Sequence, residues 1–575
     1  MKKIINLKIL ALLVVFLTGS CEKALEEKPY SFISPEQMED SPEALNLWMN
    51  GVRSTFLRDG FFRYEVFNRP YEMDCDDITG NRSFYNQTGS GNFGNADDLR
   101  GYWSSLYLLI GRSNYVIPSL NSMSNVERDE IDNAIGELNF YKAWAYFTLV
   151  RAFGPVPLSK TSVVYGEPAN LPRSSVAEVY AYIIEILKES EAQLFARTNA
   201  KYKVGMISQE AAKTMLAKVY LNMASGALSG AQITVMGGPH KNAAGQRLPS
   251  VPLQITKDIV AGHESFNASE YFRLARDKAK EVVDVADPGL ISVAGAKVGL
   301  INNWNNLWSK ASRGKAEHLW MLYSEQGKDN NGMVLTYHYC GQYDAEGRML
   351  AGSGPMGLSD HWYDLFEETD RRIRDGVIHK FTMSNNAKRW YPAKEQTPTT
   401  SPDPETLNLY KTKYGYDDPS FRHASGDQGI ARVTKYLDVT DKTLRRTDAP
   451  YPFLRYAETL LIYAEAANEV DDITEAVSKL NQVRLRSEAT PVAPGDFDKV
   501  SLRSFILEER RRELALEGNR PWDLRRWGIY LQVMNAIGND NNNIVKSREQ
   551  KHLLFALPIV EITGNTEINE NNPGW

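Results

Sequence analysis

Apolar residues recur every three or four positions through much of the N-terminal part of the chain. Between Ile131 and Phe153 they form one face of an amphipathic helix, which stops at Gly154 and Pro155. The same spacing predicts one helix before this segment and a pair of helices after it. The N-terminal helices are therefore expected at about residues 102–120, 131–153, 176–194 and 211–220.

A second helical region lies near the C-terminus, with helices expected at about residues 454–464, 476–483 and 502–516. Paired helices with small residues where they cross resemble tetratricopeptide units, although no pair carries the full consensus. The pattern predicts a fold that is predominantly all-α, a tetratricopeptide-like helical-hairpin solenoid with long irregular insertions. The solenoid would be divided between the two halves of the chain.

Two segments lack clear periodicity and are rich in Gly, Asn, Asp and Ser. The longer runs from about residue 225 to 451, and the shorter covers residues 61–100. Long irregular segments inside a compact protein are usually functional. We therefore expect any ligand-binding surface to lie in these two segments, although each aromatic residue there could instead pack onto the helices.

The composition narrows the possible functions. The 575 residues include 66 Lys and Arg against 72 Asp and Glu, a formal net charge of −6. This balance excludes a protein that binds nucleic acid through overall basic charge. The chain has three cysteines, and Cys75 and Cys340 are far apart in the sequence. Two such cysteines do not make a disulfide framework, so we expect both to be buried free thiols.

The first residues resemble a bacterial lipoprotein signal. A basic start precedes an apolar run at residues 9–17 and then Thr18-Gly19-Ser20-Cys21. The run is too short to span a bilayer. We expect cleavage after Ser20 and lipidation of Cys21, which would hold the protein at a membrane surface. The alternative is an ordinary cleaved signal that leaves Cys21 as a free thiol.

Three motifs and the C-terminal ending carry a more specific resemblance. Residues 137–158 read ELNFYKAWAYFTLVRAFGPVPL, residues 451–466 read YPFLRYAETLLIYAEA, and residues 508–527 read EERRRELALEGNRPWDLRRW. The chain ends on NPGW. Together these resemble the SusD/RagB family of nutrient-uptake lipoproteins over the whole length of the chain, with small departures at Lys142 and Asn571. The resemblance implies a signal peptide at 1–20 and one SusD-like domain at 21–575, whose halves, about 40–330 and 331–575, interleave.

The resemblance also implies a function. Members of the family bind oligosaccharides or other nutrients on the outer face of the outer membrane and pass them to a SusC-like, TonB-dependent transporter, without catalysis. The expected partners are thus a glycan, that transporter and, through the lipid, the outer membrane; neither nucleic acid, a cofactor nor a metal ion is expected. The expected ligand-binding residues are Asp74, Arg82, Tyr85, Asn86, Phe93, Trp304, Tyr339, Tyr343 and Trp390.

Two other functions remain open from the residues alone. A surface glycoside hydrolase would need a pair of carboxylates, but no pattern selects one; adjacent carboxylates such as Asp74, Asp76 and Asp77 more often face solvent, or bind calcium, than flank a sugar bond. A helical scaffold that binds only protein would explain the helix pairs, but not the anchor together with the aromatic insertions. The polar neighbours of Trp304 favour its exposure, whereas Trp103, Trp308 and Trp320 lie in patterns typical of a core.

The charges of the third motif nearly cancel and have helical spacing. Ion pairs are expected between Glu509 and Arg512 and between Glu513 and Arg510. We interpret the motif as fixing how the last helices dock rather than as a ligand site.

Overall fold

The computed structural model describes most of the chain after the N-terminal tether. The described residues are 40–58, 61–62, 67–92, 97–292, 297–326, 332–367, 369–391, 422–423 and 430–575. The expected lipidation site Cys21 and the expected ligand residue Phe93 lie outside these ranges.

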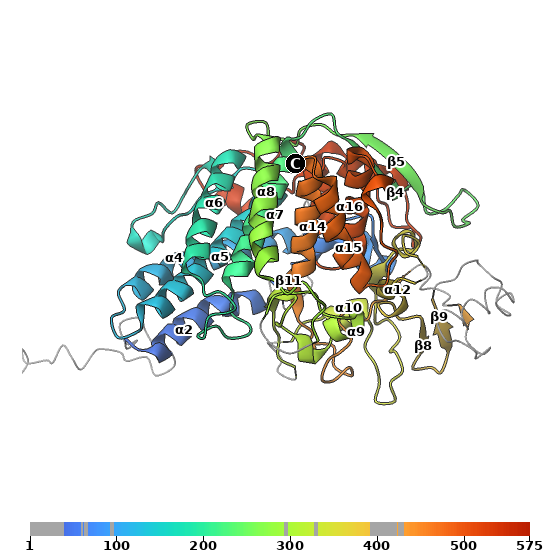
Figure 1. Cartoon of the computed structure of the whole chain (residues 1–575), viewed down its shortest axis with the longest axis horizontal. Helices are drawn as coiled ribbons and strands as arrows, with labels where there is room; N and C mark the ends of the chain where they lie inside the picture. The colour runs from blue at the N-terminus through green and yellow to red at the C-terminus, as the bar shows by residue number, and fades with distance from the viewer. Residues whose placement is uncertain are drawn as a thin grey trace, which may run out of the picture.

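Antiparallel helices form the N-terminal half of the molecule. They are α4 (Asp97–Asn121), α5 (Arg128–Phe153), α6 (Val176–Gln193) and α7 (Gln209–Ala227). Local sequence sets several of their ends: Ser175 and Glu178 form a capping box at the start of α6, and Gly154 ends α5 with a positive φ of 69°. Each helix packs against the next along the chain, as Figure 1 shows. The four predicted helices are confirmed.

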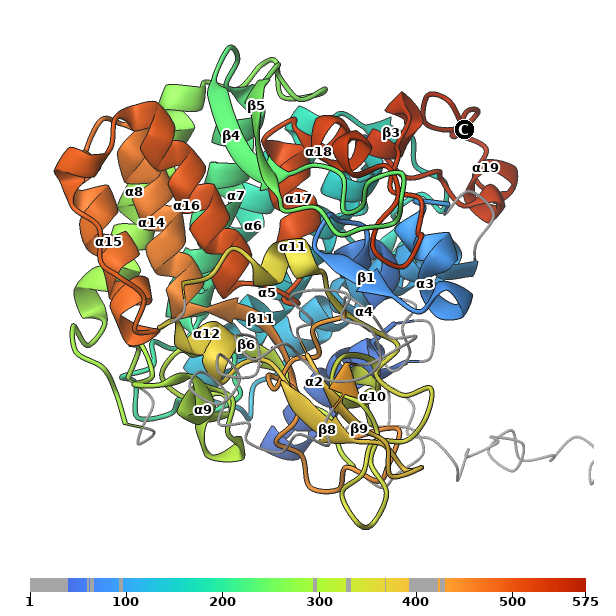
Figure 2. The same cartoon turned by 90° about the vertical axis from the view of Figure 1, so that its right-hand side faces the viewer.

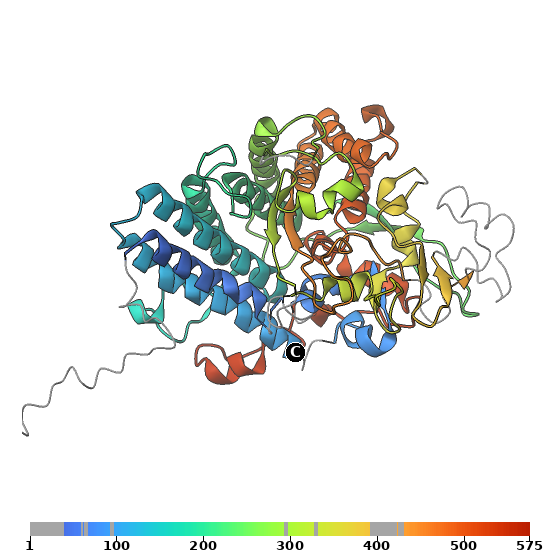
Figure 3. The same cartoon turned by 90° about the horizontal axis from the view of Figure 1, so that it is seen from below.

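The C-terminal half adds a second group of helices. The strand β11 (Tyr451–Arg455) leads into α14 (Tyr456–Glu469), followed by α15 (Ile473–Arg486) and α16 (Lys499–Glu513). The helix α14 packs against α8 (Ala268–Val285), so the helical array continues across the two halves. Seen from below, the blue and teal N-terminal helices lie on one side and the orange C-terminal helices on the other (Figure 3). The predicted helical-hairpin solenoid is confirmed.

The longest regular elements inside the segment expected to be irregular are a helix and a β-hairpin. The helix α8 buries only a narrow stripe, Phe272, Ala275, Ala279 and Val282, among charged residues, and this stripe is too sparse to stand out in the sequence. A β-hairpin joins β4 (Gln232–Gly237) to β5 (Val251–Thr256) in antiparallel register. Residues 451–455, partly assigned to a helix, instead form β11, which pairs with β6 (His318–Leu322).

The remaining elements are short. They are the helices α2 (Pro42–Arg53), α3 (Arg82–Gly89), α9 (Trp304–Leu307), α10 (Leu335–Tyr339), α11 (Asp360–Tyr363), α12 (Arg371–Arg374), α17 (Arg520–Arg526), α18 (Tyr530–Ile537) and α19 (Ile559–Gly564), and the strands β1 (Ile78–Gly80), β2 (Val156–Pro157), β3 (Arg173–Ser174), β7 (Met356–Leu358), β8 (Lys380–Thr382), β9 (Lys388–Trp390) and β10 (Arg422–His423). Across the described residues, no helix is both long and apolar enough to cross a membrane.

Aromatic side chains dominate the core where the two halves meet. The ring of Trp320 stacks on that of Phe453 with centroids 4.0 Å apart, and Trp144 packs edge-on against both. Such contacts stabilise a core beyond the area that they bury. The predicted burial of Trp103, Trp308 and Trp320 is confirmed, as is the prediction that Cys75 and Cys340 are buried free thiols.

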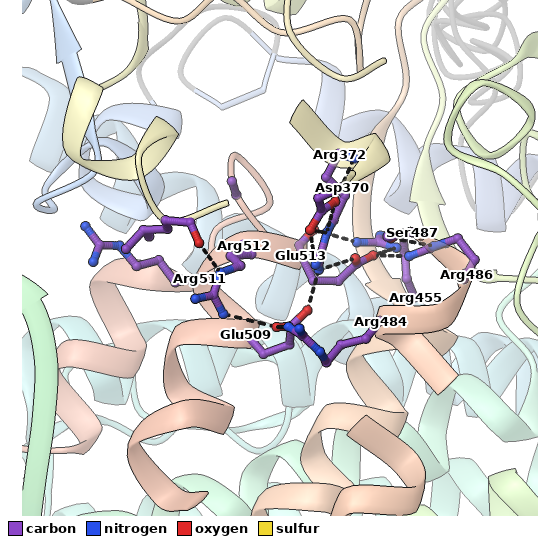
Figure 4. A network of polar contacts seen from close by, with 12 residues as sticks. Asp370, Arg372, Arg455, Arg484, Arg486, Ser487, Glu509, Arg511, Arg512 and Glu513 are labelled. Carbon is purple, nitrogen blue, oxygen red and sulfur yellow. Dashed lines mark hydrogen bonds and ion pairs between the residues drawn. The ribbon is translucent and has the colours of Figure 1, made fainter. Parts of the chain in front are cut away.

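Buried ion pairs dock the last helices. Glu513 accepts hydrogen bonds from Arg372, Arg455 and Arg486, and all four side chains are fully buried (Figure 4). The predicted pair between Glu509 and Arg512 is confirmed at 3.1 Å. The predicted pairing of Glu513 with Arg510 is wrong, because Arg510 instead binds Asp523 across the turn between α16 and α17.

Candidate functional site

The acidic cluster at the start of the first irregular segment is buried and paired with arginines. Asp74 accepts hydrogen bonds from Arg525 at 2.7 Å and from Arg548 at 2.8 Å, and is 1% exposed. Burial raises the pKa of Asp74, but the two guanidinium groups outweigh it and hold the pKa well below its usual range. A carboxylate engaged in this way has no free edge for a ligand, so the ligand-binding role expected for Asp74 is wrong.

The neighbouring Asp76 and Asp77 are paired in the same manner. Arg520 donates two hydrogen bonds to Asp76, at 2.9 and 2.7 Å, and Arg511 donates to Asp77 at 2.7 Å. The expectation that these carboxylates face solvent or bind calcium is therefore wrong. The sequence could not show the pairing, because the arginines lie more than 430 positions further along the chain.

Tyr85 also belongs to the core. Its hydroxyl donates to the carbonyl of Met73 at 2.5 Å and accepts from Lys546 at 2.9 Å, and the side chain is fully buried. The expected ligand contact for Tyr85 is therefore wrong. Its neighbour on α3, Asn86, is exposed. Arg82 begins the same helix, and its side chain lies outside what the structure describes.

The polar residues around Trp304 do not expose it. Asn303 caps α9 by accepting from the backbone N–H of Asn306, and the Asn306 amide donates to Asn302. These asparagines therefore satisfy one another, while the indole turns inward against Trp308 and is 5% exposed. Tyr339 is likewise fully buried, beside Tyr436. The ligand-binding roles expected for Trp304 and Tyr339 are wrong.

Strand pairing brings the two irregular segments to one edge of the molecule. The strands β1 and β7 are antiparallel, with Gly80 opposite Met356 and the N–H of Asn81 donating to Pro355. The helix α3, which follows β1, therefore lies beside the loop that precedes β7. In the same loop Met349 bridges to Met383, which continues into β9 and Trp390. In Figure 2, α10, β8 and β9 lie close together, and α3 lies above them beside β1.

We call this edge the binding face, as the candidate ligand surface, and define it by Tyr337, Gln342, Tyr343 and Arg445. The side chain of Tyr337 is partly exposed, and the Arg445 guanidinium lies 4.4 Å from its ring centroid. Gln342 is held by a hydrogen bond of 2.6 Å to the carbonyl of Thr443, and the half-buried Tyr343 donates to Cys340 at 3.3 Å. Aromatic rings, a guanidinium and amides at a surface can stack on a sugar ring and hydrogen-bond its hydroxyls.

Of the nine expected ligand residues, Tyr343 lies on the binding face, and Asn86 is exposed on the helix α3. The backbones of Arg82 and Trp390 lie on elements beside it, and the side chain of Trp390 is not described. Tyr337 was missed by the sequence reasoning, although the pattern of α10 held a signal. The helix buries Leu335, Thr336, His338 and Tyr339, so position 337 is the one that points outward.

Metal chemistry receives no support from the described residues. Within those ranges, no group of three or more His, Cys, Asp or Glu side chains lies close enough together to hold a metal ion.

Comparison with known proteins gives a consistent picture. A family profile described as "SusD family" matches residues 308–575, and one described as "Starch-binding associating with outer membrane" matches residues 23–221. The chain is 24% identical to SusD-like protein P38 of Formosa agariphila over the full length of both proteins. It is also 24% identical to the starch-binding protein SusD of Bacteroides thetaiotaomicron over 274 residues, which cover 41% of this chain and 47% of that protein.

The fold is similar to those of solved structures. A SusD homolog from Bacteroides thetaiotaomicron aligns with a TM-score of 0.71 at 21% identity, over 94% of this chain and 98% of that chain. Surface glycan-binding protein A from Bacteroides fluxus aligns with a TM-score of 0.64 at 17% identity, over 93% of this chain and all of that chain.

Proposed function

This chain belongs to the SusD/RagB family, and on that basis we propose that it binds a glycan at the outer membrane and delivers it to a TonB-dependent, SusC-like transporter. The observation that carries the proposal is the binding face. It presents Tyr337 and Tyr343 beside Arg445 and Gln342 at one edge of the molecule. Loops positioned by a rigid scaffold are where binding residues concentrate.

A non-catalytic role is part of the proposal. Cleavage of a glycosidic bond requires two carboxyl groups that reach the substrate. The densest acidic cluster of the irregular segments, Asp74, Asp76 and Asp77, is buried and bound to arginines, so these carboxylates do not reach a substrate. A binding protein needs only the stacking and hydrogen-bonding groups that the face offers.

Attachment to the outer membrane through Cys21 completes the proposal. The family profile over residues 23–221 and the signal-like residues before Cys21 support it. Lipid chains on this residue would keep the helical array at the membrane surface. The natural protein should incorporate labelled palmitate and the Cys21→Ser variant should not; equal labelling of both, or no labelling of the natural protein, would contradict lipidation of Cys21.

The binding role is tested with residues 22–575 on a panel of polysaccharides. Affinity gels measure binding, and an assay for reducing ends on the same polysaccharides measures cleavage. We expect retardation on at least one polysaccharide with no new reducing ends. Release of reducing ends would show an enzyme, and absence of retardation on all of them would refute glycan binding by the chain alone.

Site-directed variants locate the binding. Tyr337→Ala should weaken retardation by about three- to tenfold, since a stacked aromatic ring contributes on the order of 1 kcal/mol. The matched control is Tyr165→Ala, because Tyr165 is 46% exposed on the loop between α5 and α6, away from the binding face. Equal losses in both variants would contradict the assignment of the face.

A further inference from the structure

A hollow lies over α5, between α4 and α6, on elements other than those of the binding face. Its volume is about 640 Å³, within the range of small-molecule sites. Polar groups from all three helices and from the loop after β2 line it. Its lining includes the polar side chains of Asn139, Lys142, Lys160, Tyr182, Glu185 and Glu189.

Lys142 is the unusual member of this lining. The residue is 4% exposed, yet among the described residues its ammonium forms no ion pair and no hydrogen bond. Burial lowers the pKa of Lys142 to about 8, although Glu189, Glu167 and Glu185 act in the opposite direction. The side chain is buried but its Nζ atom opens into the hollow, where an anion could pair with it. The missing partner would be a negative charge placed in the hollow.

The surroundings of Lys142 show where that charge would sit. Its ammonium lies 5.7 Å from the ring centroid of Tyr182, and the ammonium of Lys160 lies 5.0 Å from the same centroid. Lys160 likewise has no ion-pair partner among the residues described. An anion beside the Tyr182 ring would therefore approach two cations, and the ring would offer an apolar surface to the atoms attached to it.

The other wall limits the charge and the kind of ligand. Glu185 and Glu189 are exposed in α6, and Glu189 accepts a hydrogen bond of 3.3 Å from Asn139. Two carboxylates would repel a ligand group that carries a double negative charge, such as a phosphate monoester, about twice as strongly as one that carries a single charge. They would, however, accept hydrogen bonds from hydroxyl groups. The hollow thus suits one negative charge next to several hydroxyls.

We propose that this hollow binds a sugar unit with one negative charge, which is either the carboxylate of a hexuronate or a sulfate ester. Lys142 and Lys160 hold the anion beside the Tyr182 ring. The hydroxyls of the sugar face Glu185 and Glu189. The site is additional to the binding face, and it rests on the proposed function only for the choice of a sugar.

The test is isothermal titration of residues 22–575 with three sugars of one series: galacturonate, galactose 6-sulfate and galactose. We expect saturable binding of at least one acidic sugar and none of galactose. Binding of galacturonate identifies the carboxylate, and binding of galactose 6-sulfate identifies the sulfate ester. Absence of binding by both acidic sugars, or equal binding of galactose, would overturn the proposal.

Variants assign the binding to the hollow. Lys142→Met should weaken binding of the acidic sugar at least tenfold, Lys142→Arg should restore part of it, and Lys160→Met should weaken it independently, even if Lys142→Met folds poorly. The matched control is Lys188→Met, an exposed position on α6 that does not line the hollow. Unchanged affinity in Lys160→Met or in a folded Lys142→Met, or equal loss in Lys188→Met, would overturn the assignment.

Melting temperature separates a binding role from a structural one. Because Lys142 has no partner in the described structure, Lys142→Met should leave the melting temperature unchanged or raise it; a marked decrease would show a structural lysine. The two proposals fail separately. If Tyr337→Ala loses retardation on polysaccharide gels but still binds the acidic sugar, only the binding face is affected. If Lys160→Met loses binding of the acidic sugar but keeps its retardation on the gels, only the hollow is affected.

Discussion

The charge of Glu513 should account for a measurable, pH-dependent part of the stability of this protein. Its carboxylate is fully buried among Arg372, Arg455 and Arg486 (Figure 4). Burial raises the pKa of Glu513, but the three arginines outweigh it and lower the pKa from the usual 4.5 to about 2. A shift of that size corresponds to about 3 kcal/mol of unfolding free energy.

The sign of the pH dependence follows from the lowered pKa. A carboxylate with a lowered pKa in the folded state contributes stability that is fully present above its unfolded pKa. That stability is lost as the pH falls through the folded pKa. For Glu513 the contribution to the unfolding free energy should be about 3 kcal/mol at pH 7. It should decrease once the pH is below the unfolded pKa of 4.5, and it should be on the order of 1 kcal/mol at pH 3.

Replacing Glu513 by Gln tests this reasoning, since the amide keeps the shape and removes the charge. Urea unfolding of the wild type and the variant at pH 7, 5, 4 and 3 gives the difference in unfolding free energy. We expect the difference to be largest at pH 7 and to shrink toward pH 3. The control, Glu346→Gln, alters an exposed pair with Arg348 and should change stability by less than about 0.5 kcal/mol. A difference for Glu513→Gln that is equally large at pH 3 and pH 7 would refute the electrostatic origin.

Three further predictions concern the expected ligand residues and the thiols. Trp304→Ala should lower the unfolding free energy by about 3–5 kcal/mol in urea titrations, because the indole is 5% exposed; a change below about 1 kcal/mol would show a surface ring. Asp74→Asn should lower the unfolding free energy by about 3–5 kcal/mol, because it leaves Arg525 and Arg548 without their carboxylate. The folded variant should still bind polysaccharide on affinity gels. Loss of binding without loss of stability would instead assign Asp74 to the ligand site. Cys75 and Cys340 should resist a thiol reagent until urea unfolds the chain, because both are buried and burial raises the pKa of Cys340 to about 12; rapid labelling of the native protein would contradict this.

The helices were predictable because their information is local. The periodic positions of α5, the capping residues of α6 and the glycine after α5 all lie within a few residues of the structure that they specify. Spacing also predicted the pair of Glu509 with Arg512, which are three positions apart. The partners of Asp74 and Asp77 were not predictable in this way, because they lie hundreds of positions away.

The errors in the expected ligand site have a common physical cause. Segments rich in polar residues predict a surface, but around Trp304 and Tyr85 the polar groups are satisfied within the fold. The asparagines around Trp304 cap a short helix, and the aspartates before Tyr85 bind arginines of the last helices. A polar residue reports exposure only when its hydrogen bonds go to water. Sequence shows which groups need partners but not which partners they find.

The same distinction shows how this fold can separate stability from recognition. Glu513 and its arginines join three parts of the chain, around Arg372, in β11 and in the helices α15 and α16, into one buried network. A fully paired buried network fixes a single arrangement of the elements that it connects. The binding face and the hollow over α5 lie outside that network. Their exposed residues can therefore be changed, as Tyr337→Ala and Lys160→Met do, while the buried charges keep the helices in place.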